Sequence, residues 1–234
     1  MVVGDLHLDS NVKGLSRTEE IKEVLYSLRD KFYNENYDCM IQLGDVFTPK
    51  NNKIPYYLYI LSEWLRGIDH RYVLVGNHDV IDYDYNIVHT PICSQLSISG
   101  CINFPMTIWN NDCDYTFLFL PYLLNSFAKK QYSGKSAQDV LNERAENAIE
   151  KNKNIIVFSH LNVVGATIGQ EQEIPRGSDL YLPECCVESD KVKYIFNGHY
   201  HKNQEIGKIH MPGCVIRLDM GEKDNINGYY TLEL

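Results

Sequence analysis

Five short polar islands recur in one order along the chain, and each directly follows a short apolar run rich in β-branched residues. Such runs, bounded by glycine or polar residues, are typical of buried strands, and the residues just past parallel strands gather at one edge of a sheet. The pattern predicts an α/β fold in which distant residues meet at one site. The islands are Asp5-Leu6-His7, Gly44-Asp45, Gly76-Asn77-His78-Asp79, Ser159-His160 and Gly198-His199-Tyr200-His201.

The islands supply carboxylate, amide and imidazole side chains, which together can bind two divalent metals. Two cations roughly 3.5–4 Å apart can hold a phosphate oxygen and an attacking hydroxide when a carboxylate spans them. Asp45 is the predicted bridging carboxylate. The first metal is expected to bind Asp5, His7 and His201 as well. The second is expected to bind Asn77, His160 and His199.

The donor types also bear on which metal binds. Imidazole, carboxylate and amide donors without a thiolate suit manganese, iron or zinc better than an all-oxygen magnesium or calcium site, and we favour manganese. Two carboxylates against two divalent cations leave a local formal charge of about +2. The centre can therefore attract a phosphate ester although the chain carries a net charge of −9.

One histidine of the islands, His78, is not needed as a ligand. It directly follows the predicted ligand Asn77. A histidine at this position can stabilise charge on the phosphoryl oxygens or protonate the leaving alkoxide. We therefore predict that the chain is a phosphate-ester hydrolase with His78 as its catalytic residue.

The series of islands resembles the calcineurin-like metallophosphoesterase superfamily, whose pattern is D-x-H, G-D, G-N-H-D/E, an isolated H and G-H-x-H. All five blocks are present between Asp5 and His201 without a ligand substitution. The resemblance implies a four-layer α-β-β-α sandwich, in which two mixed sheets pack face to face with helices outside.

Residues 211–222 and 228–234 are similar to the P-G-S-P-I-R-L-D-F-G-E segment and closing strand of Mre11/SbcD-type DNA repair nucleases, including phage recombination nuclease subunits. The resemblance implies a manganese-dependent DNA exo- and endonuclease with an SbcC/Rad50-like ATPase partner. Thr48 departs from that branch, because many members carry a histidine there. Residues 1–234 are expected to form a single nuclease domain, without the capping domain or ATPase-docking segment of that branch.

Basic side chains are the expected contacts to a nucleic acid, because lysine and arginine supply much of the affinity for phosphates. The chain has 22 basic and 31 acidic residues, so DNA binding without a partner is expected to be weak. Lys202, next to His201, is one predicted substrate contact. The others lie in loops after the second and fourth islands and are Lys50, Lys53 and Arg176.

Apolar residues at helical spacing predict helices over 17–34, 55–66 and 136–151, the first with a capping box of Ser16 and Glu19. Short strands are predicted at 107–109 and 115–120. Residues 82–98 are expected to form helices, and the nuclease branch implies a homodimer contact in that region.

Composition bears on where the protein acts. No apolar stretch approaches the roughly 20 residues of a membrane span, and the N-terminus lacks a secretion signal. Seven cysteines without C-x-x-C spacing argue against a disulfide framework, so most are expected to be buried thiols. The protein is expected to be soluble and intracellular, in the cytoplasm or nucleoid, and its short length would suit a phage or viral protein.

Alternative functions share the same motifs. A phosphomonoesterase, or a phosphodiesterase acting on cyclic nucleotides or other small molecules, would use the same metals and His78. The acidic composition suits a small substrate at least as well as DNA. A non-catalytic scaffold is disfavoured because every ligand is retained. The segment from Pro212 to Glu222 favours the nuclease.

Overall fold

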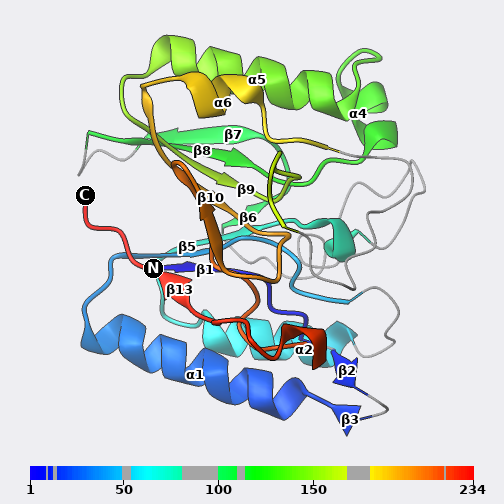
Figure 1. The fold of residues 1–234 in the computed structure, drawn as a ribbon, viewed down its shortest axis with the longest axis vertical. Coiled ribbons are helices and arrows are strands. Elements are labelled where there is room, and N and C mark those ends of the chain that lie inside the picture. Colours follow the sequence, from blue (N-terminus) through cyan, green and yellow to red (C-terminus); the bar gives the residue numbers. More distant parts are fainter. Residues whose placement is uncertain are drawn as a thin grey trace.

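The computed structural model describes residues 1–8, 10–12, 15–48, 54–80, 100–109, 114–167, 180–218 and 220–234. Two β-sheets pack face to face, and helices cover their outer faces (Figure 1). Both sheets contain parallel and antiparallel pairs. The predicted four-layer α-β-β-α sandwich of mixed sheets is confirmed.

The first sheet has the strand order β13-β1-β4-β5-β6. Four of its strands run parallel, and only β13 pairs antiparallel with its neighbour β1 among the described residues. Residues that follow β1, β4 and β5 therefore leave the sheet at the same edge. The strands are β1 Val2–Val3, β4 Cys39–Gln42, β5 His70–Leu74, β6 Cys101–Ile102 and β13 Tyr229–Tyr230.

The second sheet has the order β11-β12-β10-β9-β8-β7. Its central strands β12, β10, β9 and β8 are parallel, and the edge strands β11 and β7 are antiparallel to their neighbours. The strands are β7 Met106–Trp109, β8 Thr116–Leu120, β9 Ile155–Ser159, β10 Val192–Asn197, β11 Gln204–Ile206 and β12 Ile209–Met211. A separate hairpin pairs β2 Asn11–Val12 with β3 Leu15–Ser16.

Helices α1 Thr18–Asn34 and α2 Ile54–Trp64 cover the first sheet. Helices α4 Asn125–Gln131, α5 Ala137–Lys151 and α6 Glu184–Glu188 cover the second. Two short 3₁₀ turns, η1 Asn77–Asp79 and η2 Met220–Glu222, follow β5 and precede β13. None of the described helices has the length and apolar character needed to cross a membrane.

Alternation of side chains along the strands builds three separate cores. Val3 of β1 packs beneath α1 and α2, whereas its neighbour Val2 points into the space between the sheets. Val157 of β9 likewise packs beneath α5, whereas Phe158 lies between the sheets. This period of two is the reason that a run such as 155–158 is apolar throughout, because both of its faces are buried.

Both α1 and α5 begin within one residue of the expected positions, but the capping box expected for α1 is wrong. Ser136 caps α5, accepting a hydrogen bond from the backbone of Asp139 at 3.1 Å. The capping box of Ser16 and Glu19 is not formed, because Ser16 belongs to β3 and Arg17 is the N-cap of α1. Residues 82–98, with their expected helices and homodimer contact, lie outside the described residues.

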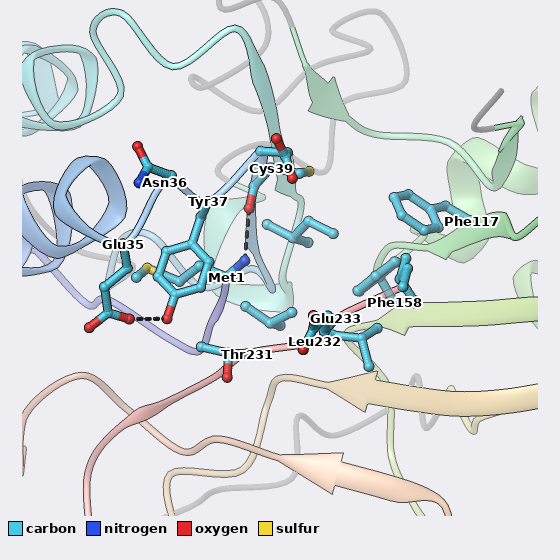
Figure 2. A pocket seen from close by; sticks show the side chains of 14 residues that line it. Met1, Glu35, Asn36, Tyr37, Cys39, Phe117, Phe158, Thr231, Leu232 and Glu233 are labelled. Atoms are coloured by element: carbon cyan, nitrogen blue, oxygen red, sulfur yellow. Dashed lines mark hydrogen bonds between the residues drawn. The ribbon is translucent and has the colours of Figure 1, made fainter. Parts of the chain in front are cut away.

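A cavity of about 590 Å³ lies beside the first residues of β1 and β4 (Figure 2). Its apolar lining includes Phe117 and Phe158 between the sheets. The Met1 ammonium donates to the Cys39 carbonyl at 2.8 Å, and burial lowers the pKa of this ammonium. None of the lining residues belongs to the five islands, so the cavity is separate from the site that the islands form.

The described cysteines are in two states. Cys101 is disulfide-bonded, whereas the sequence pattern argued against a disulfide framework and predicted that most cysteines are buried thiols. Cys39, Cys185, Cys186 and Cys214 are not in disulfides, and the last two are buried. Cys186 and Cys214 are therefore buried thiols, whereas Cys101 is not a free thiol.

Candidate metal centre

The islands follow β1, β4, β5, β9 and β10, and the packing of the two sheets brings them together. Contacts at 4.0 Å or less connect every predicted ligand except His201, whose ring centroid lies 5.0 Å from that of His7. The parallel sheet edges thus assemble a set that spans almost 200 positions of sequence. Its members are Asp5, His7, Asp45, Asn77, His78, His160, His199 and His201.

The first candidate metal group contains Asp5, His7 and His201, as expected, together with Cys214. One donor atom from each lies within 4.8 Å of the others. Asp5 Oδ2 and His7 Nε2 are buried and make no hydrogen bond within the described part of the chain. Burying such atoms without partners is costly. A cation between them would satisfy both, so these residues fit a bound metal.

Thr48 determines which ring nitrogen of His7 faces the first metal group. Its hydroxyl lies 3.3 Å from His7 Nδ1. With Nδ1–H donating to the hydroxyl, Nε2 keeps the lone pair that a metal requires. The residue that departs from the nuclease branch therefore still contacts the site, through His7.

The second candidate metal group contains Asp45, His160 and His199, again with donor atoms within 4.8 Å of one another. Asn77 Oδ1 lies 3.0 Å from His160 Nε2 and 3.0 Å from His199 Nδ1. The amide oxygen of Asn77 therefore lies beside this group. Asn162 Oδ1 lies 3.2 Å from His199 Nε2 and holds the other side of that ring.

His160 shows why a positive charge is needed here. Its Nδ1 donates to the Leu43 carbonyl at 2.7 Å, so a neutral ring presents a lone pair at Nε2. That Nε2 faces the acceptors Asp45 Oδ2 at 3.3 Å and Asn77 Oδ1 at 3.0 Å. Burial disfavours the charged ring, but Asp45 and Asp5 raise the pKa of His160 to about 9. A cation among these three acceptors would take the place of the proton.

Asp45 lies between the two groups. Its Oδ2 is 3.3 Å from His160 Nε2 in the second group and 4.0 Å from His7 Nε2 in the first. Its Oδ1 accepts the backbone N–H of His78 at 2.9 Å. Burial would raise the pKa of Asp45, but the histidines around it hold that pKa well below its usual range. An ionised carboxylate in this position is placed to bridge two metals.

Strained backbone orients the site. His7, Asp45 and His199 have φ angles of 44°, 51° and 76°, in the left-handed region that non-glycine residues rarely adopt. Such conformations cost about 1–3 kcal/mol each and persist where the surrounding structure enforces them. Gly76 allows the loop after β5 to approach Asp45 closely, because a Cβ at this position would lie 2.1 Å from Asp45 Oδ1.

Asp79 joins two of the ligand loops. Its Oδ1 accepts the backbone N–H groups of Val46 and Phe47 at 2.9 and 3.1 Å, and its Oδ2 accepts that of Gly76 at 2.8 Å. The loop after β4 is thereby fixed to the loop after β5. Asp79 belongs to the third island, but no role was predicted for it from the sequence.

Glu222 orients His201. Its Oε1 lies 2.8 Å from His201 Nδ1, and its Oε2 accepts the backbone N–H of Leu218 at 2.6 Å. Burial opposes the charge on His201, but Glu222 raises the pKa of the ring. With Nδ1–H donated to the carboxylate, Nε2 remains for a metal. Glu222 and Cys214 lie in the tail segment that resembles the nuclease branch. That resemblance was the one feature of the sequence that could have indicated a role for them at the site. Asn162 had no signal in the sequence.

The His78 side chain is more exposed than that of His201, which is 19 % exposed. The side chain of His78 is 35 % exposed, whereas that of Asp45 is 1 % exposed. Its Nε2 lies 4.0 Å from Asp45 Oδ2, and its ring centroid is 5.4 Å from that of His7. The side chain thus lies over the centre where a substrate would approach.

One of the four predicted substrate contacts lies within the part of the chain that the structure describes. Lys202 is exposed beside His201, and its backbone carbonyl is 3.5 Å from the amide nitrogen of Gln204. Lys50, Lys53 and Arg176 lie outside the described residues. Their roles as substrate contacts stay predictions, as do the metal-binding roles of the individual ligands.

Two solved structures have a similar fold. A dimetal phosphatase from Danio rerio has a TM-score of 0.55 at 12% identity, over 90% of this chain and 84% of that chain. A candidate 5′-nucleotidase from Staphylococcus aureus has a TM-score of 0.50 at 13% identity, over 91% of this chain and 48% of that chain, so this chain spans about half its length. At these identities the likeness concerns the fold alone.

No curated protein matches the sequence. The model of the calcineurin-like phosphoesterase family does match, over residues 1–203, a range that contains all five islands. The family depends on two metal ions, and this chain brings two candidate metal groups together at Asp45. The chain therefore belongs to the calcineurin-like phosphoesterase family.

Proposed function

We propose that the chain is a dinuclear-metal phosphodiesterase that cleaves DNA, as an exo- and endonuclease of the Mre11/SbcD type in repair, recombination or replication. The main support for a metal-dependent hydrolase is the pair of donor groups that meet at Asp45. In the first group, the buried atoms Asp5 Oδ2 and His7 Nε2 make no hydrogen bond to the described residues. The tail supports the nuclease, because the segment that resembles that branch lines the first group with Cys214 and Glu222.

Two divalent cations, manganese in this proposal, would bind the phosphate and activate a water for attack on phosphorus. The chain's own residues prepare the site for them. Asp45 is held ionised between the groups, and Thr48 and Glu222 direct His7 and His201. Asn77 adds a neutral oxygen that carries no charge to repel the substrate.

His78 is proposed to donate a proton to the leaving oxygen. Its backbone N–H is fixed to Asp45 Oδ1, while its ring is exposed above the centre. General acid catalysis by a positioned histidine contributes roughly 10²–10⁴-fold to a rate. The exposure of His78 beside Asp45 supports this role, because the ring is open to an incoming substrate.

The net charge of the chain bears on whether it needs a partner to bind DNA. A net charge of −9 opposes binding to a polyanion, so the proposal includes an SbcC/Rad50-like ATPase or a second copy of the chain that helps to hold DNA. A DNA substrate also implies an intracellular site of action. Lys202, Lys50, Lys53 and Arg176 remain the proposed contacts of this chain with the backbone phosphates.

A second candidate is a phosphomonoesterase or a small-molecule phosphodiesterase. The same net charge of −9 favours it, because a small phosphate ester needs only the local positive charge of a metal centre. Hydrolysis of p-nitrophenyl phosphate in preference to its bis ester would favour the monoesterase, and the reverse preference a diesterase.

The deciding experiment is manganese-dependent cleavage of end-labelled linear double- and single-stranded DNA by the purified chain, with H78A in parallel. Cleavage by the wild type and its loss in H78A would support the nuclease, and the product ladder would give its polarity. An intact, metal-loaded chain that leaves both DNAs uncut while hydrolysing p-nitrophenyl phosphate would overturn the nuclease in favour of the second candidate.

A further inference from the structure

We propose that Cys214 is a metal donor of the first group, so that this group selects zinc or iron(II) over manganese. The inference deepens the proposed function and rests on it only for the presence of a metal at Asp5, His7 and His201. It replaces the expectation of a thiolate-free centre, and it assigns zinc or iron(II) to the first group in place of the manganese of the proposed function.

Cys214 is placed among the ligands. One donor atom each from Asp5, His7, His201 and Cys214 lies within 4.8 Å of the others, and Cys214 has no exposed surface. The group therefore offers two imidazole nitrogens, one carboxylate oxygen and one sulfur. Zinc in proteins binds donors of all three types. Asp45, which lies 4.0 Å from His7, would add a fifth donor as the bridge to the second group.

The backbone holds Cys214 between two of the other donors. Its N–H donates to the carbonyl of His201 at 3.2 Å, and the N–H of the next residue, Val215, donates to the carbonyl of Asp5 at 3.0 Å. Gly213 has a φ of 80°, and a Cβ there would lie 2.7 Å from the His201 carbonyl oxygen. The close approach of the tail thus fixes where the sulfur lies.

An independent observation indicates that a ligand belongs in this group. Asp5 Oδ2 and His7 Nε2, both buried, make no hydrogen bond within the described part of the structure. A hydrogen-bonded core would satisfy such atoms with a donor or a water. Their convergence with a thiol and an imidazole indicates a cation as the common partner.

The chemistry gives a direction of metal preference. On binding, the metal–sulfur bond forms, and the thiol proton passes to solvent. Thiolate sulfur is a soft donor that suits zinc and iron, whereas manganese suits oxygen donors. The second group, Asp45, His160 and His199 with Asn77, contains no sulfur. The two groups are therefore expected to differ in metal preference within one centre.

Cobalt(II) titration of the metal-free protein tests the sulfur directly, because a cobalt–thiolate bond gives a near-ultraviolet charge-transfer band and oxygen or nitrogen donors do not. Three proteins would be compared: wild type, C214S and C186S. Cys186 is the matched control, since it is equally buried but packs in the core beneath α5. Cobalt bound per chain would be counted in each.

We expect the band in wild type and C186S and its loss in C214S. Cobalt binding to wild type without the band, or a band that persists in C214S, would overturn the role of Cys214 while leaving a metal centre in place. Failure of wild type to bind any cobalt or zinc would overturn the metal centre itself, and the role of Cys214 with it.

A measurement on the wild type alone guards against a C214S protein that does not fold. Zinc K-edge absorption of the zinc-loaded chain should show a sulfur neighbour at about 2.3 Å. A first shell of nitrogen and oxygen only would contradict the proposal.

Discussion

Glu222 Oε1 lies 2.8 Å from His201 Nδ1, and the other oxygen of the same carboxylate accepts the backbone N–H of Leu218. The tail therefore sets both the tautomer and the orientation of a predicted metal ligand. Partners of this kind act on affinity without touching the metal, and their loss typically weakens binding about 10–100-fold.

E222A is accordingly expected to weaken one of the two metal sites about 10–100-fold while the other is unchanged. Isothermal titration of metal into the metal-free protein measures both sites. E205A is the matched control, because Glu205 makes a similar contact, 3.0 Å, with His210 away from the centre. Equal weakening in both variants would show a general effect on folding instead.

H78A is expected to keep its metal content and lose about 10²–10⁴-fold in turnover, because the ring is not among the buried donors. Metal analysis and steady-state hydrolysis of a phosphodiester measure the two quantities. H70A, at the exposed start of β5, serves as the control. Loss of metal from H78A would mean that this histidine is a ligand.

D45N is expected to lose metal and activity together, since it removes the negative charge that lies between the two groups. Thermal unfolding with and without metal provides a second readout. A ligand at 100 times its Kd stabilises the folded state by about 2.7 kcal/mol, so the wild type should gain stability and D45N should not. A metal-free D45N protein that still hydrolyses substrate would contradict the two-metal assignment.

The metal-free protein should lose stability as pH rises from about 6.5 to 9. The pKa of His160 is raised to about 9 in the fold from a usual 6.5, so the folded state holds a proton that the unfolded chain has released. Its contribution is complete below pH 6.5 and is lost as pH passes 9. Melting temperatures of chelator-treated wild type and H160N would be compared, and equal slopes in this interval would refute the assignment.

S136A is expected to destabilise the protein by about 1 kcal/mol through loss of the α5 cap. Ser136 Oγ accepts the backbone N–H of Asp139 at 3.1 Å, far from the metal centre in the chain and on the outer layer of the fold. Urea unfolding measures the effect. S16A should change stability less, because Ser16 does not cap α1.

The position of the five islands at strand ends could be predicted because each depends on a short stretch of sequence, whereas the order of layers was implied by the family resemblance. A buried strand followed by glycine and a polar residue places that residue at a sheet edge, and parallel strands share that edge. Asp45 and His160 were assigned on this basis, and the structure places them 3.3 Å apart.

Cys214, Glu222 and Asn162 could not be assigned in this way. Their positions depend on how the tail and a loop return to the site, which no local pattern encodes. The capping box at Ser16 failed for a related reason, since a plausible local signal was overridden when Ser16 paired with Asn11 in a hairpin. Motifs at strand ends predict reliably, whereas contacts made by returning segments require the fold.

The contact of the tail with Asp5 and His201 has a consequence for how the protein is made. The first donor group draws on residue 5 and on residue 214, and its orienting carboxylate is residue 222. A ribosome adds residues in order, so a growing chain that has already formed β1, β4 and β5 still lacks a complete centre. The first candidate metal group can therefore be complete only after translation has passed Cys214, and its orienting carboxylate follows eight residues later.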